Sequence, residues 1–178
     1  MLNPDTSARI IVGCDNGASG GWAAISPSGP IIDLMPMPVD IPSKYIDVVA
    51  IMRWLRSITH GDLQRADIWI EKPTGAKSYN AAKSMWSSFH SIRGAIVSHG
   101  LTLREVSPRT WQTAMMHTTK EKGSKRQETA LAAQIWPNQV WPTLRPKGKK
   151  LHDGIIDATL IAKYAQIKCH NTQNCLTQ

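Results

Sequence analysis

The sequence is poor in acidic residues, with 13 Asp and Glu against 21 Lys and Arg, which gives a formal net charge of +8. A chain with this excess of positive charge attracts polyanions such as nucleic acids. The sequence also lacks the run of about 20 apolar residues that a membrane-spanning helix needs, so no membrane association is expected. The chain starts with the polar stretch MLNPDTSAR, and we therefore expect no signal peptide.

Cysteine is scarce too, with Cys14, Cys169 and Cys175 and no CxxC pair. Without such a pair a structural zinc site is not expected. The first cysteine lies in an apolar segment and the other two lie near a polar end of the chain. This pattern is typical of reduced thiols, and it predicts a cytoplasmic protein.

The length of 178 residues suits one domain with a substantial core. We expect this domain to span residues 1–170 and a polar, disordered tail to follow over residues 171–178. Apolar runs predict strands at residues 9–14, 22–26, 31–35, 68–70 and 101–106. Helical spacing predicts helices at residues 44–58, 81–99, 126–136 and 153–167, with a shorter one opening at Ser107-Pro108. Three meander strands followed by strands alternating with helices predict an α/β fold, with a mixed five-stranded sheet flanked by helices.

Two of the few acids follow apolar strands directly. Asp15 ends the first strand, within VGCDNGASGGW, and Glu71 ends the fourth, within IWIEKP. The carboxyl ends of strands are the usual place for a site in such sheets. The alternatives are an Asp that makes an Asp-Asn-Gly turn and a Glu that is merely an exposed strand end.

Two more acids, Asp153 and Asp157, are four residues apart at the start of the last helix, within HDGIIDATLIA. This spacing puts both on one helix face, where like charges repel unless a cation binds between them. Asp153 could instead be the N-cap of the helix. Together, the four carboxylates favour a site for Mg²⁺ or Mn²⁺, which prefer oxygen ligands. Two such ions ~3.5–4 Å apart can activate a water and stabilise the leaving 3′-oxygen of a phosphodiester.

These motifs resemble the RuvC-like Holliday junction resolvases of the ribonuclease H-like superfamily, over about residues 9–167. The resemblance rests on the Gly-rich turn with Asp15, the strand that ends in Glu71 and the run Asp153-Gly154-Ile155-Ile156-Asp157-Ala158-Thr159-Leu160-Ile161-Ala162. The runs SPRTWQ (107–112) and KEKGSKRQETALAAQIWP (120–137) resemble the phage and plant-plastid branch.

The resemblance implies a metal-dependent, structure-selective endonuclease that resolves four-way DNA junctions by paired cleavage, with two Mg²⁺ or Mn²⁺ ions per active site and no small-molecule cofactor. Asp15, Glu71, Asp153 and Asp157 would be the catalytic metal ligands. Some members carry a His near the third ligand position, so His152 is an alternative to Asp153. A two-fold symmetric junction asks for two active sites, and thus for a homodimer. The phage-type resemblance suggests a phage-encoded protein that acts in the cytoplasm of a bacterial host.

Basic residues gather near the predicted site in three clusters, which we expect to contact DNA phosphates. The first also holds Tyr79, the first candidate for stacking on an opened base, whereas Trp86 and Phe89 are expected in the core or a dimer contact. The clusters are Lys72, Lys77 and Lys83; Lys120, Lys122, Lys125 and Arg126; and Arg145, Lys147, Lys149 and Lys150. Each could instead be a solvated loop.

Three other functions fit parts of the sequence. One is a ribonuclease H-like nuclease that acts on other branched DNA or on RNA. Another is a non-catalytic DNA-binding protein, although all four acids are present. The third is an actin-like sugar kinase or ATPase, which the short chain and the lack of a second phosphate loop oppose.

Overall fold

A computed structural model describes residues 9–43, 45–75, 78–116, 125–145 and 148–175, except for the side chains of 125–126 and 171–175. Its centre is one five-stranded sheet in the order β3-β2-β1-β4-β5. The strands are β1 (Ile10–Asp15), β2 (Gly21–Ile25), β3 (Ile31–Pro36), β4 (Ala66–Glu71) and β5 (Leu103–Val106). The first three form an antiparallel meander, while β4 pairs parallel with β1 and with β5. The predicted mixed α/β fold is confirmed.

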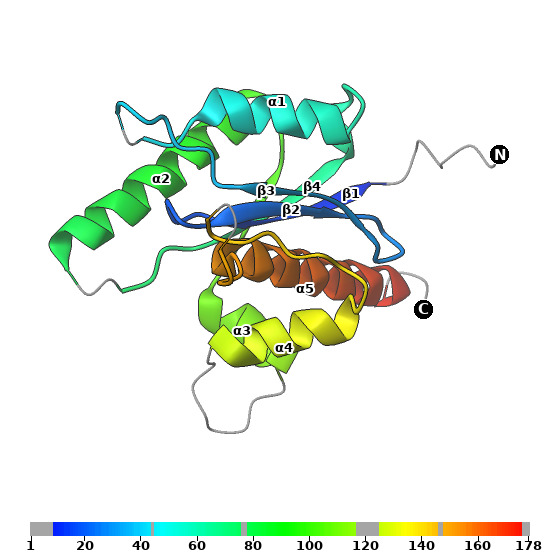
Figure 1. Cartoon of the computed structure of the whole chain (residues 1–178). Helices are drawn as coiled ribbons and strands as arrows, with labels where there is room; N and C mark the ends of the chain where they lie inside the picture. The colour runs from blue at the N-terminus through cyan, green and yellow to red at the C-terminus, as the bar shows by residue number, and fades with distance from the viewer. Residues whose placement is uncertain (1–8, 44, 76–77, 117–124, 146–147, 176–178) are drawn as a thin grey trace.

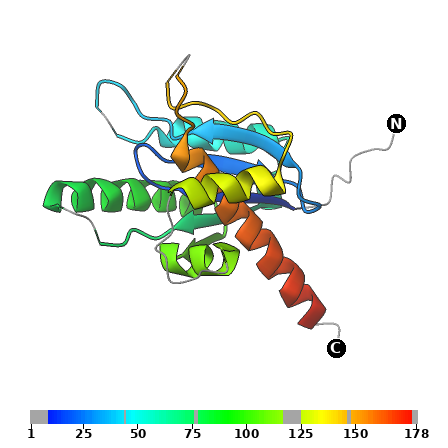
Figure 2. The ribbon, with the colours of Figure 1, turned by 60° about the horizontal axis from the view of Figure 1, so that its bottom comes forward.

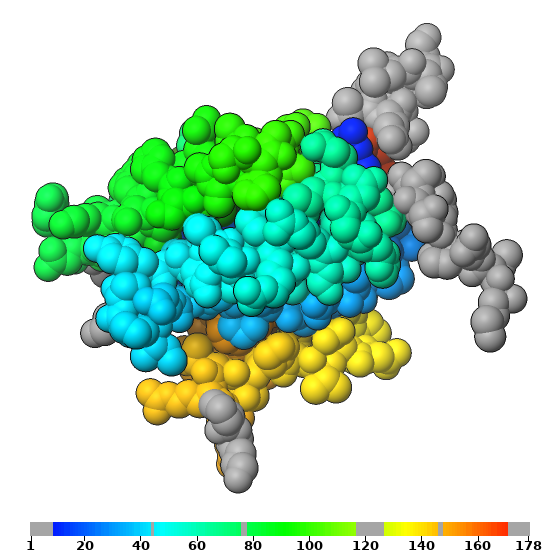
Figure 3. All heavy atoms as spheres, turned by 90° about the horizontal axis from the view of Figure 1, so that it is seen from above, coloured from blue at the N-terminus to red at the C-terminus, as the bar shows by residue number. Residues whose placement is uncertain are grey.

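Helices cover both faces of the sheet. They are α1 (Val48–Ile58), α2 (Tyr79–Ser98), α3 (Pro108–Met116), α4 (Lys125–Ile135) and α5 (Asp153–Cys175), with a short 3-10 turn at Leu63–Arg65. Figure 1 shows α1 and α2 on one face and α3, α4 and α5 on the other. Seen from above, α1 and α2 lie side by side over their face (Figure 3). Figure 2 shows α5 crossing the opposite face on a diagonal.

Strand alternation divides the core between the two faces. Val12 and Cys14 of β1, with Ile68 and Ile70 of β4, pack with α1 and α2. Ile11 of β1 instead packs with α5 residues. Because successive side chains of a strand point to opposite faces, the residues between the buried ones of β1 and β4 face α5. This alternation decides where the acids at the strand ends point.

Helix α5 lies so close to β1 that only glycine fits between them. A Cβ on Gly13 would stand 2.1 Å from the Ala158 carbonyl oxygen and 2.6 Å from the Ala162 nitrogen. A Cβ on Gly154 would stand 2.4 Å from the Cα of Gly20. Side chains there would collide with backbone, so these glycines hold the start of α5 against the turn that follows β1.

Several element boundaries differ from those predicted. Helix α1 begins at Val48 rather than at residue 44, because the Asp47 side chain accepts a hydrogen bond of 2.9 Å from the Ala50 N–H and caps the helix. Helix α2 begins at Tyr79 and not at residue 81, because the Ser78 side chain caps it, so Tyr79 lies in the helix.

Helix α5 runs to Cys175, so residues 171–175 of the predicted tail are helical, and 176–178 lie outside the described residues. The extent of the predicted domain, residues 1–170, stays a prediction. In the part of the chain that the structure describes, none of the helices has the length and apolarity to span a membrane.

Candidate metal centre and nucleic-acid interface

Asp15 and Glu71 stand at the ends of two neighbouring parallel strands. Cys14 of β1 pairs with Ile70 of β4, so the two acids occupy the next positions along the same edge of the sheet. Burial raises the pKa of the Cys14 thiol, and the charges of Asp15 and Glu71 raise it further. Both carboxylates thus act on this thiol, which places them at one end of the sheet.

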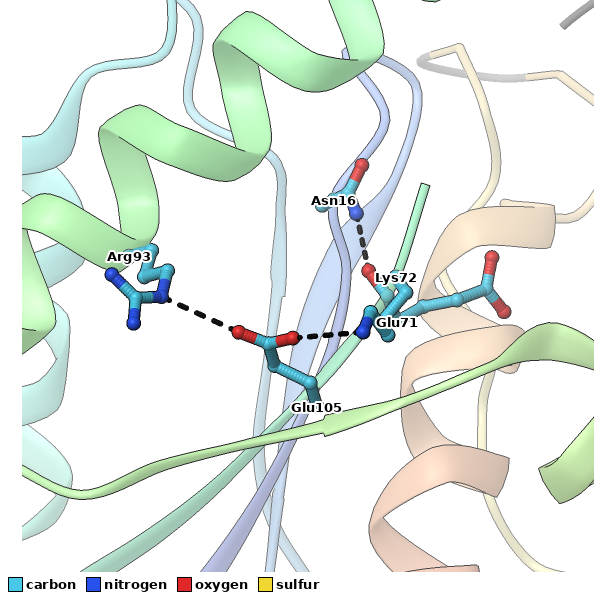
Figure 4. A network of polar contacts seen from close by, with 5 residues as sticks. All are labelled: Asn16, Glu71, Lys72, Arg93 and Glu105. Carbon is cyan, nitrogen blue, oxygen red and sulfur yellow. Dashed lines mark hydrogen bonds and ion pairs between the residues drawn. The ribbon is translucent and has the colours of Figure 1, made fainter. Parts of the chain in front are cut away.

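Strand alternation points both acids toward α5. On β1, Ile11 has the same orientation as Asp15 and packs on α5 residues. On β4, Trp69 has the same orientation as Glu71 and packs edge-on against Tyr164 of α5, with ring centroids 5.8 Å apart. Figure 4 shows the Glu71 side chain pointing toward the helix that carries the other two predicted ligands. Asp15 also accepts a hydrogen bond of 3.3 Å from the Gly17 N–H, which is the Asp turn considered as its alternative role.

The two acids of α5 lie in different surroundings. Asp157 is buried, with 8% of its surface exposed, between Ile156 and Ala158. Asp153 stands in the first turn, 29% exposed, and its carboxylate is 3.3 Å from the ammonium of Lys150. Such exposed pairs contribute only about 0–1 kcal/mol, so a divalent cation can compete for Asp153.

His152, and not Asp153, is the residue that precedes α5. Its Nδ1 accepts a hydrogen bond of 3.3 Å from the Ile155 N–H, and its carbonyl accepts one of 3.0 Å from the same group. Burial lowers the pKa of His152, which favours the neutral ring. The N-cap role considered for Asp153 therefore falls to His152, because α5 begins one residue earlier than that role requires.

The surroundings of Glu71 include two residues for which no role was predicted from the sequence. The indole N–H of Trp111, in α3, donates a hydrogen bond of 2.6 Å to Glu71 Oε2. The side-chain amide of the buried Asn16 donates to the Glu71 carbonyl and ties the ends of β1 and β4 together (Figure 4). The position of Trp111 in SPRTWQ, directly after β5, indicated that it lies near the ends of the strands. Hydrophobic periodicity, however, does not predict which carboxylate its indole N–H binds.

The donor set fits a hard divalent cation in chemistry, since all four acids offer carboxylate oxygens. Among the described residues, however, no three His, Cys, Asp or Glu side chains form a group that could hold a metal ion as they stand. Asp15, Glu71, Asp153 and Asp157 would hold the ion, and binding would have to draw them together. The choice between Asp153 and His152 as third ligand stays open, although the Nδ1 of His152 is engaged by the helix backbone.

Lys72 is not placed as the sequence suggested. It follows Glu71 on the strand, so its side chain points to the opposite face, where its ammonium pairs with Glu105 at 3.2 Å. Arg93 of α2 holds the same carboxylate at 3.3 Å, as Figure 4 shows. Lys72 thus joins β4, β5 and α2, and it lies away from the face toward which Glu71 points.

The connector between α4 and α5 folds back on itself. Thr143 pairs with Leu151, and the His152 N–H donates 2.9 Å to the Pro142 carbonyl. This arrangement presents Arg145 and Lys149, both exposed, next to the start of α5.

The other expected DNA contacts divide into those that the structure describes and those it does not. Lys83 and Tyr79 are exposed on α2, with 81% of Tyr79 accessible. Phe89 is buried, as predicted, and packs edge-on against Trp86 with centroids 5.8 Å apart, while Trp86 is 43% exposed. Outside the described residues lie Lys77, Lys120, Lys122 and Lys147, and the side chains of Lys125 and Arg126.

Comparison with known proteins gives structural matches only. No protein-family model matches the sequence, and no curated protein matches it. The solved structure of Thermus thermophilus RuvC in complex with a Holliday junction substrate matches with a TM-score of 0.62 and 14% identity, over 92% of this chain and 97% of that chain. Another Thermus thermophilus RuvC structure matches with a TM-score of 0.54 and 13% identity, over 90% and 97% of the two chains. The chain therefore has a ribonuclease H-like fold of the kind found in RuvC.

Proposed function

We propose that this protein is a metal-dependent, structure-selective endonuclease that resolves four-way DNA junctions. Two observations support the proposal. Asp15 and Glu71 stand on adjacent strand ends, and the helix that bears Asp153 and Asp157 is packed closely on β1 and on the turn after it. The likeness in fold to RuvC, one of whose structures holds a Holliday junction substrate, supports junction DNA as the substrate.

The chemistry proposed for the site is in-line hydrolysis of a phosphodiester. Asp15, Glu71, Asp153 and Asp157 would hold two Mg²⁺ or Mn²⁺ ions, with the buried Asp157 as the ligand that the helix positions. Bound there, the ions would supply activation of the attacking water and charge stabilisation of the leaving 3′-oxygen. Because a junction carries two strands to be cut, the proposal includes a homodimer with one site per protomer.

The proposed DNA surface has two parts, one at the start of α5 and one on the first turns of α2. Arg145 and Lys149 bind phosphates in the first part, and Lys83 does so in the second. Lys72 is left out of both, because its ammonium is paired with the Glu105 carboxylate. Tyr79, exposed in the first turn of α2, remains the aromatic proposed to stack on an opened base.

The test is cleavage of a labelled four-way junction in Mg²⁺ or Mn²⁺, with the cuts mapped on all four strands. Asp15→Asn, Glu71→Gln and Asp157→Asn should each abolish cleavage, while junction binding persists because it depends on Lys and Arg. Asp62→Asn is a matched control, since Asp62 is exposed at a distant turn. An Asp15→Asn variant that cuts at the wild-type rate would falsify the site assignment.

A second candidate is a DNA-binding protein without nuclease activity. One observation favours it: among the described residues, no three His, Cys, Asp or Glu side chains form a preformed metal site. Flaps, hybrids and linear duplexes in the same assay separate the junction resolvase from a nuclease with another branched or RNA substrate. Binding to the junction without cuts in either metal would favour the second candidate.

A further inference from the structure

The indole of Trp111 is built into the proposed metal centre without being able to bind a metal itself. Its Nε1–H donates to Glu71 Oε2 at 2.6 Å, a short distance that is typical of a hydrogen bond to a charged oxygen. An indole is a donor only, so it cannot take a coordination position. What it can do is fix the rotation of the Glu71 carboxylate.

The position of this indole is set by packing on every side. Trp111 is fully buried, and it belongs to a cluster with Val106 at the end of β5 and with Ile156 and Leu160 of α5. Ile156 directly precedes Asp157, the buried acid of the site. Trp111 therefore joins the helix that carries Asp157 to the carboxylate at the end of β4.

The backbone of Glu71 is fixed separately. The buried Asn16, next to Asp15, donates its side-chain amide to the Glu71 carbonyl. With the backbone held by Asn16, the remaining freedom of Glu71 is rotation about its side-chain bonds, and that is the freedom that the Trp111 hydrogen bond restricts.

We infer that Trp111 is a positioning residue, which presents the Glu71 carboxylate to the divalent cation in the proposed nuclease. The inference rests on the proposed function and adds a residue to its site. Groups that hydrogen-bond to metal-binding carboxylates typically change metal affinity about 10–100-fold when they are lost. We expect a change of that size when the indole N–H is removed.

The test variant is Trp111→Phe, which keeps an aromatic ring in the cluster and removes the donor. Trp69→Phe is the first control, because Trp69 packs on the same face and its buried indole N–H has no hydrogen-bond partner among the described residues. Trp136→Phe is the second, because its indole donates 3.0 Å to the Gly29 carbonyl, in the β2–β3 hairpin. Trp69→Phe measures the effect of losing ring volume alone. Trp136→Phe measures the effect of losing an indole hydrogen bond elsewhere, so an effect seen only in Trp111→Phe comes from the bond to Glu71.

The primary measurement is Mn²⁺ binding in the absence of DNA, by calorimetry or by the electron paramagnetic resonance of free Mn²⁺. Trp111→Phe should raise the dissociation constant about 10-fold or more, and neither control should change it more than about twofold. The Mn²⁺ concentration that gives half-maximal junction cleavage should rise in parallel, so that excess Mn²⁺ restores cleavage. Thermal unfolding in EDTA measures any purely structural effect of the three variants.

The outcomes separate the inference from the function on which it rests. If the wild type binds Mn²⁺ and cuts junctions but Trp111→Phe binds Mn²⁺ equally well, Trp111 is not a positioning residue and the nuclease proposal stands. If the wild type binds no Mn²⁺, the proposed function fails and the role of Trp111 falls with it.

A second measurement covers the case in which Trp111→Phe does not fold. In wild-type protein labelled with ¹⁵N-tryptophan, the seven indole N–H signals are assigned through single Trp→Phe variants, the last one by elimination. Paramagnetic Mn²⁺ should broaden the Trp111 indole signal at lower metal concentration than any other. If another indole signal broadens first, the inference is overturned.

Discussion

Tyr79 is the single residue whose surroundings best fit a direct contact with bases. It is the first residue of α2 and 81% exposed, in the same turn as the exposed Asn80. The helix gives it a fixed position, although the sequence predicted a helix only from residue 81 onward. A ring that is already exposed can stack on an unpaired base without any rearrangement of the core.

We predict that Tyr79→Ala reduces cleavage of an intact four-way junction far more than binding to it. Stacking is worth about 1–3 kcal/mol per base, and linear duplex offers no opened step on which to gain it. A junction with unpaired bases at its centre should be cut by the variant nearly as well as by the wild type. Tyr79→Phe, which keeps the ring, should behave as the wild type on both substrates.

Equal activity of Tyr79→Ala and the wild type on the intact junction would rule out this role. Trp86 would then be the next candidate, since it is 43% exposed on the same helix, whereas Phe89 is buried.

At the scale of elements, the close fit of α5 against β1 sets the start of the helix, which carries Asp153 and Asp157, against the turn that follows Asp15. Gly13 faces the backbone of α5, with a Cβ position 2.1 Å from the Ala158 carbonyl oxygen. A methyl group there cannot be accommodated by moving a flexible side chain, because the atoms that it meets belong to the helix backbone. The helix as a whole would have to move.

We predict that Gly13→Ala destabilises the fold by about 1–3 kcal/mol, as overpacked core substitutions usually do, and abolishes cleavage by displacing Asp157. Gly94→Ala is the matched control. Gly94 lies within α2, and a methyl group added there would meet no heavy atom within 4 Å among the described residues, so the change should stabilise by about 0.5–1 kcal/mol. Thermal and urea unfolding would measure both, and a Gly13→Ala protein as stable as the wild type would contradict the packing argument.

Elements were the level that the sequence predicted best. Strand periodicity and glycine-rich turns gave all five strands and the mixed sheet, because these signals are local. Helix starts were less well predicted. Helix α1 begins later than its apolar spacing indicates, because Asp47 caps it, and α2 begins earlier, because Ser78 caps it. The last helix, predicted to end at residue 167, was predicted too short, because the mostly polar residues 168–175 extend it without an apolar stripe.

Contacts between distant segments could not be predicted from such local signals. The bond from Trp111 to Glu71 joins residues that are 40 positions apart. For Lys72, alternation from the buried Ile68 and Ile70 does predict the face of α2, but it does not predict that Glu105 of β5 is the partner there. The carboxylates at the ends of strands could be expected at one edge, but their spacing could not.

For the whole molecule, the net charge of +8 matters through where the cations lie. Arg145 and Lys149 are exposed beside the start of α5, whereas Arg53 and Arg56 are exposed on α1, which covers the other face of the sheet (Figure 1). Both pairs carry the same charge. If only total charge mattered, removing either pair would weaken DNA binding equally, but phosphate contacts are local.

We predict that junction binding weakens steeply with salt and that Arg145→Gln/Lys149→Gln makes this dependence shallower. Each phosphate contact contributes about 0.9 to the slope of log affinity against log salt on duplex arms, so losing two contacts should lower the slope by about 1.8. Arg53→Gln/Arg56→Gln should leave the slope unchanged, although it lowers the net charge by the same amount. Fluorescence anisotropy with a labelled junction in EDTA, between about 50 and 200 mM salt, measures binding without cleavage. A flat slope for the wild type would refute binding through phosphates, and an equal loss in both double variants would show that the charge acts diffusely and not through the surface at the start of α5.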